Sequence, residues 1–230
     1  MRTGGTYRGP PRSSESIDQP FTARSSAMAF RSPPGPDPVR RSEAVAGSIH
    51  KEYHRVVISP VGKWDDPLLQ LLSARVESVF GFRSETIPLL ESIDFALDPV
   101  RRQYHSTPIL EKLSDAAPVQ AVKVLCLVQE DLFIPILTHV YGEAQLGGRA
   151  CMVSTHRLGE GLPSTGLGRV AYEERIVKEA IHELGHTFNL RHCPDAACIM
   201  HYCHTVQDVD RKTKDLCRYC TVLLKDELGR

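Results

Sequence analysis

The sequence predicts an α/β protein, built from short buried strands that alternate with helices. Two segments carry this prediction. Residues 121–128 read A-V-K-V-L-C-L-V, an apolar run with the length of a buried strand. Residues 172–190 form a long segment with apolar positions at helical spacing. The 230 residues suffice for one substantial domain with its own core, with or without a tail.

The predicted elements begin with a strand at residues 53–60, centred on the β-branched run Val56-Val57-Ile58. A helix follows, capped by Asp65 or Asp66 and ended by Gly81. Its apolar positions are Leu68, Leu69, Leu72, Val76, Val79 and Phe80. The remaining predicted elements are strands at 83–89, 137–142 and 149–155 and a helix at 107–113.

Residues 1–47 are predicted to be a disordered extension in front of one domain over residues 48–230. The segment 32–38 reads S-P-P-G-P-D-P, and its prolines oppose both a helix and a strand ladder. An organelle transit peptide is an alternative, because arginines outnumber acidic residues in this extension. Such a peptide needs an amphipathic helix, which the prolines disfavour, so a plain tail is the preferred interpretation.

Composition argues against several classes of partner. The formal net charge is zero, which gives no field that would attract nucleic acid or an anionic membrane. No apolar run is long enough to span a bilayer. The start of the chain lacks the apolar core of a secretory signal, and K-D-E-L at 225–228 is followed by two further residues. We therefore expect an intracellular, cytoplasmic monomer whose thiols stay reduced.

The segment 182–192 reads H-E-L-G-H-T-F-N-L-R-H and predicts a metal site. His182 and His186 are four residues apart, so on a helix both imidazoles project from one face and can bind one ion. Glu183 lies about 100° round the helix from His182, beside the ion but not on it. A third ligand, His192, reaches the ion only if the helix ends and the chain turns back near Asn189. Three neutral nitrogens leave one zinc position open for water, as a catalytic site requires.

A solvated helix with incidental histidines is the alternative interpretation of this segment. It does not explain the apolar residues that bury the helix, which are Ile176, Val177, Ala180, Ile181 and Leu184. We therefore favour the zinc site.

A second cluster contains five of the seven cysteines. Cys193 and Cys198 form one pair, and Cys217 and Cys220 form a C-x-x-C pair after 18 intervening residues. Two such pairs suit a closed, tetrahedral zinc site with four thiolates, which is structural because no position stays open. Disulfides fit poorly in a reducing compartment. Cys203 is the surplus cysteine and could in principle replace Cys198.

These motifs resemble the archaemetzincin family of metzincin zinc peptidases. The metzincin pattern is H-E-x-x-H-x-x-G-x-x-H followed by a turn methionine, here Met200. The resemblance extends over about residues 49–221. It is carried by H-C-P-D-A-A-C-I-M at 192–200, C-R-Y-C at 217–220, R-R-Q-Y-H-S-T at 101–107, Y-G-E-A-Q-L-G-G-R-A at 141–150 and V-Q-D-V-D-R-K at 206–212.

The resemblance implies a zincin-like mixed sheet, an active-site helix and a small C-terminal zinc-bound subdomain over residues 193–230. It also implies one catalytic and one structural zinc, peptide or protein substrates, and Glu183 as general base. The family pattern assigns the structural site to Cys193, Cys198, Cys217 and Cys220. Asn189 departs from the glycine of the pattern, but its short side chain tolerates positive φ better than other residues.

Two function classes remain open at this point. A peptidase uses Glu183 to accept a proton from water, whereas a non-catalytic, zinc-stabilised module would only bind peptides. Glu183 favours the enzyme, because a module has no need of a base there. Strand 149–155 is a weaker signal, either an edge strand that pairs with an extended substrate or an ordinary sheet strand. Asp208 and Asp210 are expected equally as anchors for a ligand imidazole or the cysteine subdomain and as surface charge. Arg101–Arg102 are too few to indicate nucleic acid and are expected to pack near the cleft.

Overall fold

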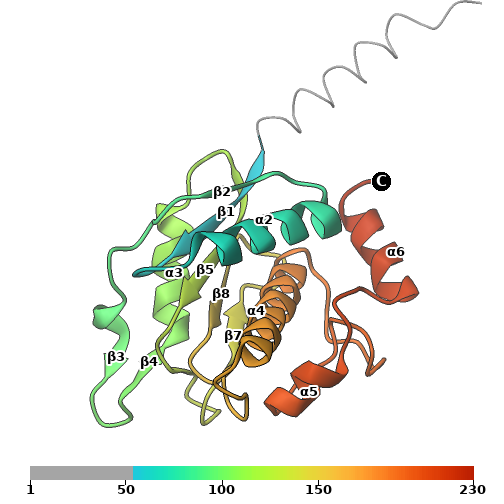
Figure 1. The fold of residues 1–230 in the computed structure, drawn as a ribbon. Helices are drawn as coiled ribbons and strands as arrows, with labels where there is room; N and C mark the ends of the chain where they lie inside the picture. The colour runs from blue at the N-terminus through green and yellow to red at the C-terminus, as the bar shows by residue number, and fades with distance from the viewer. Residues whose placement is uncertain (1–53) are drawn as a thin grey trace, which may run out of the picture.

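The computed structural model describes residues 54–230, so the predicted tail lies outside the described residues. Its centre is a five-stranded sheet in the order β2-β1-β5-β8-β7 (Figure 1). Four strands run parallel and β7 runs antiparallel to β8 at one edge. The strands are β1 (Arg55–Pro60), β2 (Ser84–Thr86), β5 (Ala121–Val128), β7 (Gly142–Ala144) and β8 (Ala150–Ser154). A smaller sheet contains β3 (Leu97–Asp98), β4 (Gln103–His105) and β6 (Leu132–Phe133).

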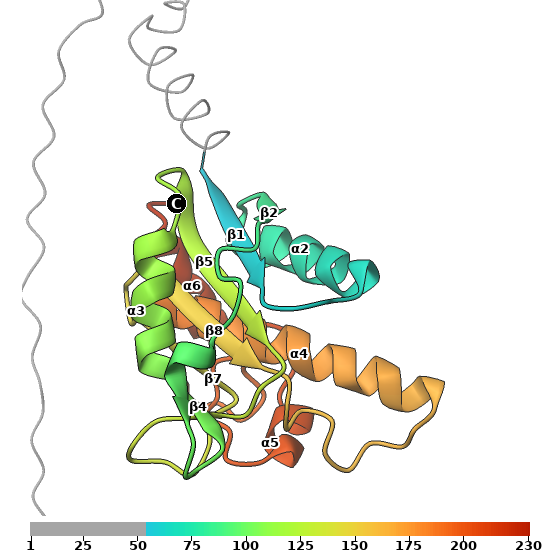
Figure 2. The same ribbon diagram turned by 90° about the vertical axis from the view of Figure 1, so that its left-hand side faces the viewer.

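Helices cover both faces of the main sheet, and Figure 2 shows α3 on one face with α2 and α4 on the other. The helices are α2 (Asp66–Phe80), α3 (Ser106–Ala116) and α4 (Gly166–Thr187), with a short 3-10 turn, η1 (Asp94–Ala96). Because strand side chains alternate between faces, Leu125 and Leu127 pack under α4 while Val124 and Cys126 pack under α3. The strands therefore read as continuous apolar runs.

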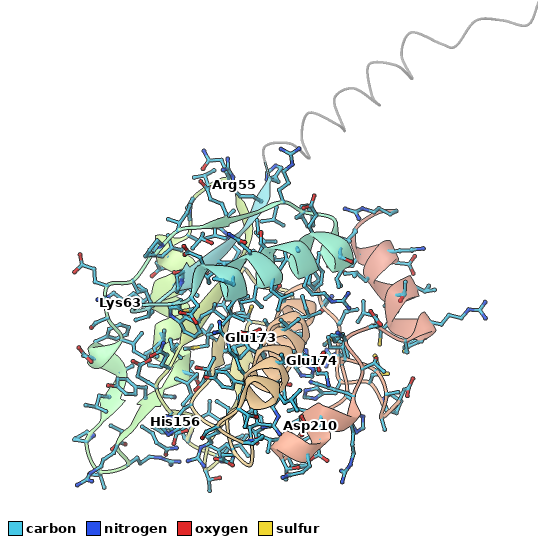
Figure 3. The ribbon with its side chains drawn as sticks, viewed as in Figure 1. Arg55, Lys63, His156, Glu173, Glu174 and Asp210 are labelled. Carbon is cyan, nitrogen blue, oxygen red and sulfur yellow. The ribbon has the colours of Figure 1, made fainter. Side chains whose placement is uncertain are left out.

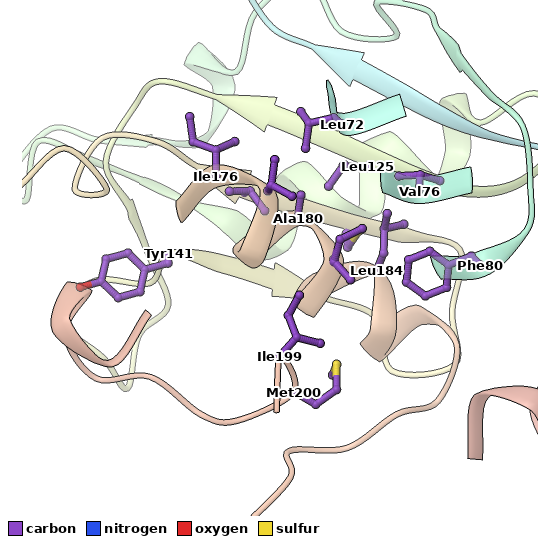
Figure 4. Packing of buried hydrophobic residues seen from close by; sticks show 14 of the residues in the cluster. Leu72, Val76, Phe80, Leu125, Tyr141, Ile176, Ala180, Leu184, Ile199 and Met200 are labelled. Carbon is purple, nitrogen blue, oxygen red and sulfur yellow. The ribbon is translucent and has the colours of Figure 1, made fainter. Parts of the chain in front are cut away.

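The chain after α4 forms the C-terminal subdomain with two further helices, α5 (Val206–Arg211) and α6 (Arg218–Glu227). Figure 4 shows Ile199 and Met200 of this segment against the underside of α4, beside Leu184. Within residues 54–230 no helix has the length and apolar character needed to cross a membrane.

The structure confirms the mixed α/β architecture and several predicted boundaries. Strand β5 spans the predicted residues 121–128, and Gly81 ends α2 with a left-handed φ of 72°. Helix α4 begins earlier than predicted, at Gly166, because Thr165 caps it by accepting a hydrogen bond from the Gly168 backbone N–H. The first turn contains Gly166 and Gly168, which disfavour a helix in the sequence, so the prediction began later.

The predicted strand at residues 137–142 is wrong. Residues 134–139 instead form a loop at the rim of a cleft, and the strand, β7, begins only at Gly142. Leu137 is 39% exposed, so its apolar side chain was not evidence for a buried strand. The Arg101 guanidinium holds this loop by donating to the carbonyls of Leu137 and Thr138 at 3.0 Å. The predicted position of Arg101 near the cleft is confirmed.

Candidate metal centres

Helix α4 presents His182 and His186 on one face, as their spacing predicts. The Nδ1–H of His182 donates to the Ile199 carbonyl at 2.8 Å, and that of His186 donates to the Leu190 carbonyl at 2.7 Å. These bonds fix the tautomer, because a carbonyl only accepts. Both Nε2 lone pairs are thus left free, and the two Nε2 atoms lie 3.1 Å apart.

The environment keeps these imidazoles neutral, which metal binding requires. Burial lowers the pKa of His182 well below its ordinary value, and the buried Lys212 ammonium lowers it further. Burial likewise lowers the pKa of His186 to about 4. Protons therefore do not compete for the two nitrogens at neutral pH.

A turn after α4 brings His192 close to His182 and His186. Asn189 has a φ of 64°, so the predicted left-handed conformation is confirmed. The His192 ring lies 5.3 Å from that of His182 and 4.8 Å from that of His186, measured between centroids. One ring nitrogen of each histidine lies within 4.8 Å of the others, a separation that suits ligands of one ion.

Replacing Asn189 tests this turn. We expect Asn189→Val to lower zinc affinity at the histidines and thermal stability, because a β-branched side chain clashes with the backbone at positive φ. Asn189→Gly should keep or slightly raise both, by less than about 1 kcal/mol. Zinc titration and thermal melts measure these effects. Wild-type zinc affinity in the valine variant would contradict this role of the turn.

Met200 packs beneath the histidines, as the metzincin pattern implies. It is fully buried, and a Cβ added to Gly185 of α4 would lie 2.5 Å from its sulfur. The glycine between His182 and His186 therefore makes room for the methionine. Met200 supports the site by packing, since a thioether competes poorly with imidazoles for zinc.

The four predicted cysteines also converge, with their sulfurs within 4.8 Å of one another. The Sγ atoms of Cys193 and Cys217 lie 3.7 Å apart, and no cysteine of the described chain is in a disulfide. Backbone N–H groups point at two sulfurs, from Cys217 to Cys198 Sγ and from Cys220 to Cys217 Sγ. Such donors stabilise thiolates, so the cluster fits a closed zinc site. Cys203 lies outside it.

A cleft of about 320 Å³ opens above the three histidines. Glu183 lines it but is only 6% exposed, and burial raises its pKa well above the ordinary value. Gly142, at the start of β7, faces Glu183 so closely that a Cβ there would lie 2.6 Å from Glu183 Cγ. The sequence offered no signal for this contact.

The substrate-pairing strand predicted at residues 149–155 is wrong, because β8 pairs with β5 on one side and β7 on the other. Its backbone groups are already used. The free edge beside the cleft belongs to β7, whose residues 142–144 line it. The short polar sequence of β7 carries no apolar pattern that would reveal it.

Hydrogen bonds from side chains of α4 hold α5 against it. The Arg175 guanidinium forms a bidentate pair with Asp210 at 2.7 and 2.8 Å, and Figure 3 shows Asp210 on α5 beside α4. The Lys178 ammonium donates to the carbonyls of Val209 and Asp210. Asp210 thus anchors the subdomain, whereas Asp208 forms a capping box with Thr205 inside α5. Sequence analysis did not identify the partners Arg175 and Lys178.

Comparisons with known proteins agree with this geometry. Residues 90–226 match Peptidase family M54. An archaemetzincin of Methanopyrus kandleri is 42% identical over 137 residues, which cover 60% of this chain and 74% of that protein. The crystal structure of an archaemetzincin from the same organism matches with a TM-score of 0.66 at 34% identity, over 77% of this chain and 97% of the other. That of a zinc-dependent peptidase from Methanocorpusculum labreanum matches with a TM-score of 0.64 at 28% identity, over 74% and 99%.

Proposed function

We propose a mechanism for a chain that belongs to peptidase family M54, the archaemetzincins, and is therefore a zinc metallopeptidase. Peptide bonds are hydrolysed in the cleft above His182, His186 and His192, with Glu183 as general base. The observation that carries the proposal is the position of Glu183. It lines the cleft beside three neutral imidazoles but does not belong to the group of side chains that could hold the ion.

The three histidines would hold the catalytic ion. Zinc bound there supplies a Lewis acid that polarises the scissile carbonyl and lowers the pKa of a water. Glu183 accepts a proton from the attacking water and delivers it to the leaving amine. Burial of Glu183 suits this role, because its raised pKa makes the carboxylate a better proton acceptor.

The peptide would lie along the free edge of β7. An extended chain can form main-chain hydrogen bonds with this edge, which orients the scissile bond across the cleft. Glu143 of β7 fastens the strand to α3. Its carboxylate accepts hydrogen bonds from the hydroxyls of Ser106 and Thr107 at the start of that helix. These bonds fix β7 to the body of the domain.

A diverse peptide library tests the proposal. The zinc-loaded protein should generate new peptide termini, and removing the histidine-bound zinc should abolish them. Adding zinc back should restore the same cleavage pattern, which excludes a contaminating peptidase of different metal dependence. Binding without cleavage would instead support the alternative, a non-catalytic module that docks peptides.

We expect two zinc ions for each chain, and they should differ in lability. The three-histidine site keeps an open position where a chelator such as phenanthroline can attack, whereas the four-thiolate site is closed. Metal analysis during chelation should show loss of the first zinc before the second. A single zinc for each chain after expression in zinc-replete medium would contradict the assignment of both sites.

A further inference from the structure

The cleft is lined by three carboxylates, and no lysine or arginine of the described chain lines it. Glu183 is the proposed base, and Glu143 is held by two hydroxyls at the start of α3. The third carboxylate, Glu179, has no role in the mechanism above. It lies one turn before Glu183 on the same face of α4, because four residues advance a helix by about 400°.

Glu179 is 3% exposed, yet it is part of the cleft wall. Its Oε1 lies 2.7 Å from the Nζ of Lys212. Lys212 follows α5, is 1% exposed and does not line the cleft. The carboxylate therefore stands in front of the ammonium, and the negative end of the buried pair faces the cleft.

Two neutral side chains of the cleft wall lie close enough to this carboxylate to feel its charge. Tyr141 enters from the segment before β7, and Cys203 follows the Met200 turn. In Figure 4 the hydroxyl of Tyr141 points toward the C-terminal segment. Burial raises the pKa of Tyr141 to about 12 and that of Cys203 to about 11, so neither carries charge at neutral pH.

Two other cations of this region, Arg157 and Arg175, have acidic partners of their own. Arg157 is paired with Asp131 at 2.7 Å, and Arg175 with Asp210 at 2.7 Å. Lys212 is the single described partner of Glu179. A substrate side chain that reaches this part of the cleft therefore meets a desolvated carboxylate whose one described partner is Lys212.

We propose that Glu179, Tyr141 and Cys203 form a specificity subsite that takes a lysine or arginine side chain of the substrate, next to the scissile bond. The inference rests on the proposed peptidase function. A cationic N–H donor forms a strong, charge-assisted bond to a buried carboxylate. An acidic side chain is rejected by like charge, and an apolar one leaves the carboxylate without a partner. Lys212 partners the Glu179 carboxylate while the subsite is empty, since an unpaired buried charge is costly.

Peptides that differ only at the residue beside the scissile bond test the subsite. With lysine, leucine and glutamate at that position, we expect kcat/KM to favour lysine over leucine by about tenfold and over glutamate by about a hundredfold. In the double variant Glu179→Met with Lys212→Met, leucine should become preferred over lysine. Replacing a buried ion pair by apolar side chains of similar volume generally preserves the fold.

The matched control removes a lysine–glutamate pair from the outer face of the same helix. Glu174 and Lys214 lie 3.2 Å apart and are about half exposed, and Figure 3 shows Glu174 on the outer side of α4. The double variant Glu174→Gln with Lys214→Met should keep the wild-type order of the three peptides. Glu179→Gln provides a second test if the methionine variant fails to fold, with the lysine preference expected to fall about tenfold.

The outcomes separate the subsite from the peptidase function. Equal cleavage of the three peptides by the wild type, or an unchanged lysine preference in the Glu179 variants, overturns the subsite and leaves the peptidase standing. Absence of any cleavage overturns the peptidase. In that case, the Kd values of the same peptides decide: tighter binding of the lysine peptide that is lost in the Glu179 variants supports the subsite, and equal binding overturns it.

Discussion

Replacing Glu183 by glutamine is expected to lower kcat by about a hundredfold to ten-thousandfold, the usual contribution of a general base. The amide has the same shape but accepts no proton at neutral pH. Glu183 is not among the zinc ligands, so the variant should retain two zinc ions and peptide binding close to that of the wild type. Single-turnover kinetics, metal analysis and peptide binding measure the three quantities on one preparation.

Glu173 offers a matched control on the same helix. It is paired with Arg169 at 2.8 Å and does not line the cleft, and Figure 3 labels it on α4. Glu173→Gln should leave kcat unchanged. An unchanged kcat in Glu183→Gln would remove the base from the mechanism, and loss of zinc in that variant would show that Glu183 supports the metal.

The convergence of the candidate metal ligands was predictable because their spacing within short segments determines where they meet. His182 and His186 share a helix face, and Asn189 was the one residue near the helix end that tolerates positive φ well. The spacing within and between the cysteine pairs likewise predicts that the four sulfurs converge on one ion. In each case the information is local, and the structure places the residues together as predicted.

The walls of the cleft were not predictable, because they depend on contacts between distant segments. Glu179 lies on α4 and Lys212 directly follows α5, and nothing in the spacing of either segment indicates that these two residues pair. The pairing of β8 on both sides likewise depends on β7, a strand of three residues without apolar alternation. The apolar character of a segment such as 149–155 predicts that the strand is buried, but it does not predict which strands lie on either side.

One consequence of this arrangement is that β7 directly constrains Glu183, the proposed base. Gly142 lies on the face of β7 that is directed toward α4, and it pairs with Val153 of β8. A Cβ at residue 142 would lie 2.7 Å from Glu183 Oε1 and 2.6 Å from the Met152 carbonyl oxygen. The second contact is with backbone in a buried strand, which cannot move aside without loss of sheet hydrogen bonds.

Gly142→Ala is therefore expected to displace either the edge strand or Glu183. Since a misplacement of about 1 Å can cost a hundredfold in rate, we expect kcat/KM to fall by about that factor. The free energy of unfolding should fall by about 1–3 kcal/mol, as for overpacked sites. Both zinc ions should remain, because residue 142 belongs to neither candidate ligand set.

Gly166→Ala is the control, since a Cβ at residue 166 meets nothing within 4 Å. It lies in the first turn of α4, where alanine favours the helix, so stability and kcat/KM should stay at or slightly above the wild-type values. Retained activity in Gly142→Ala would show that β7 can shift outward without disturbing Glu183. The edge strand would then be an adaptable wall of the cleft, and the close contact between Gly142 and Glu183 would not be required for catalysis.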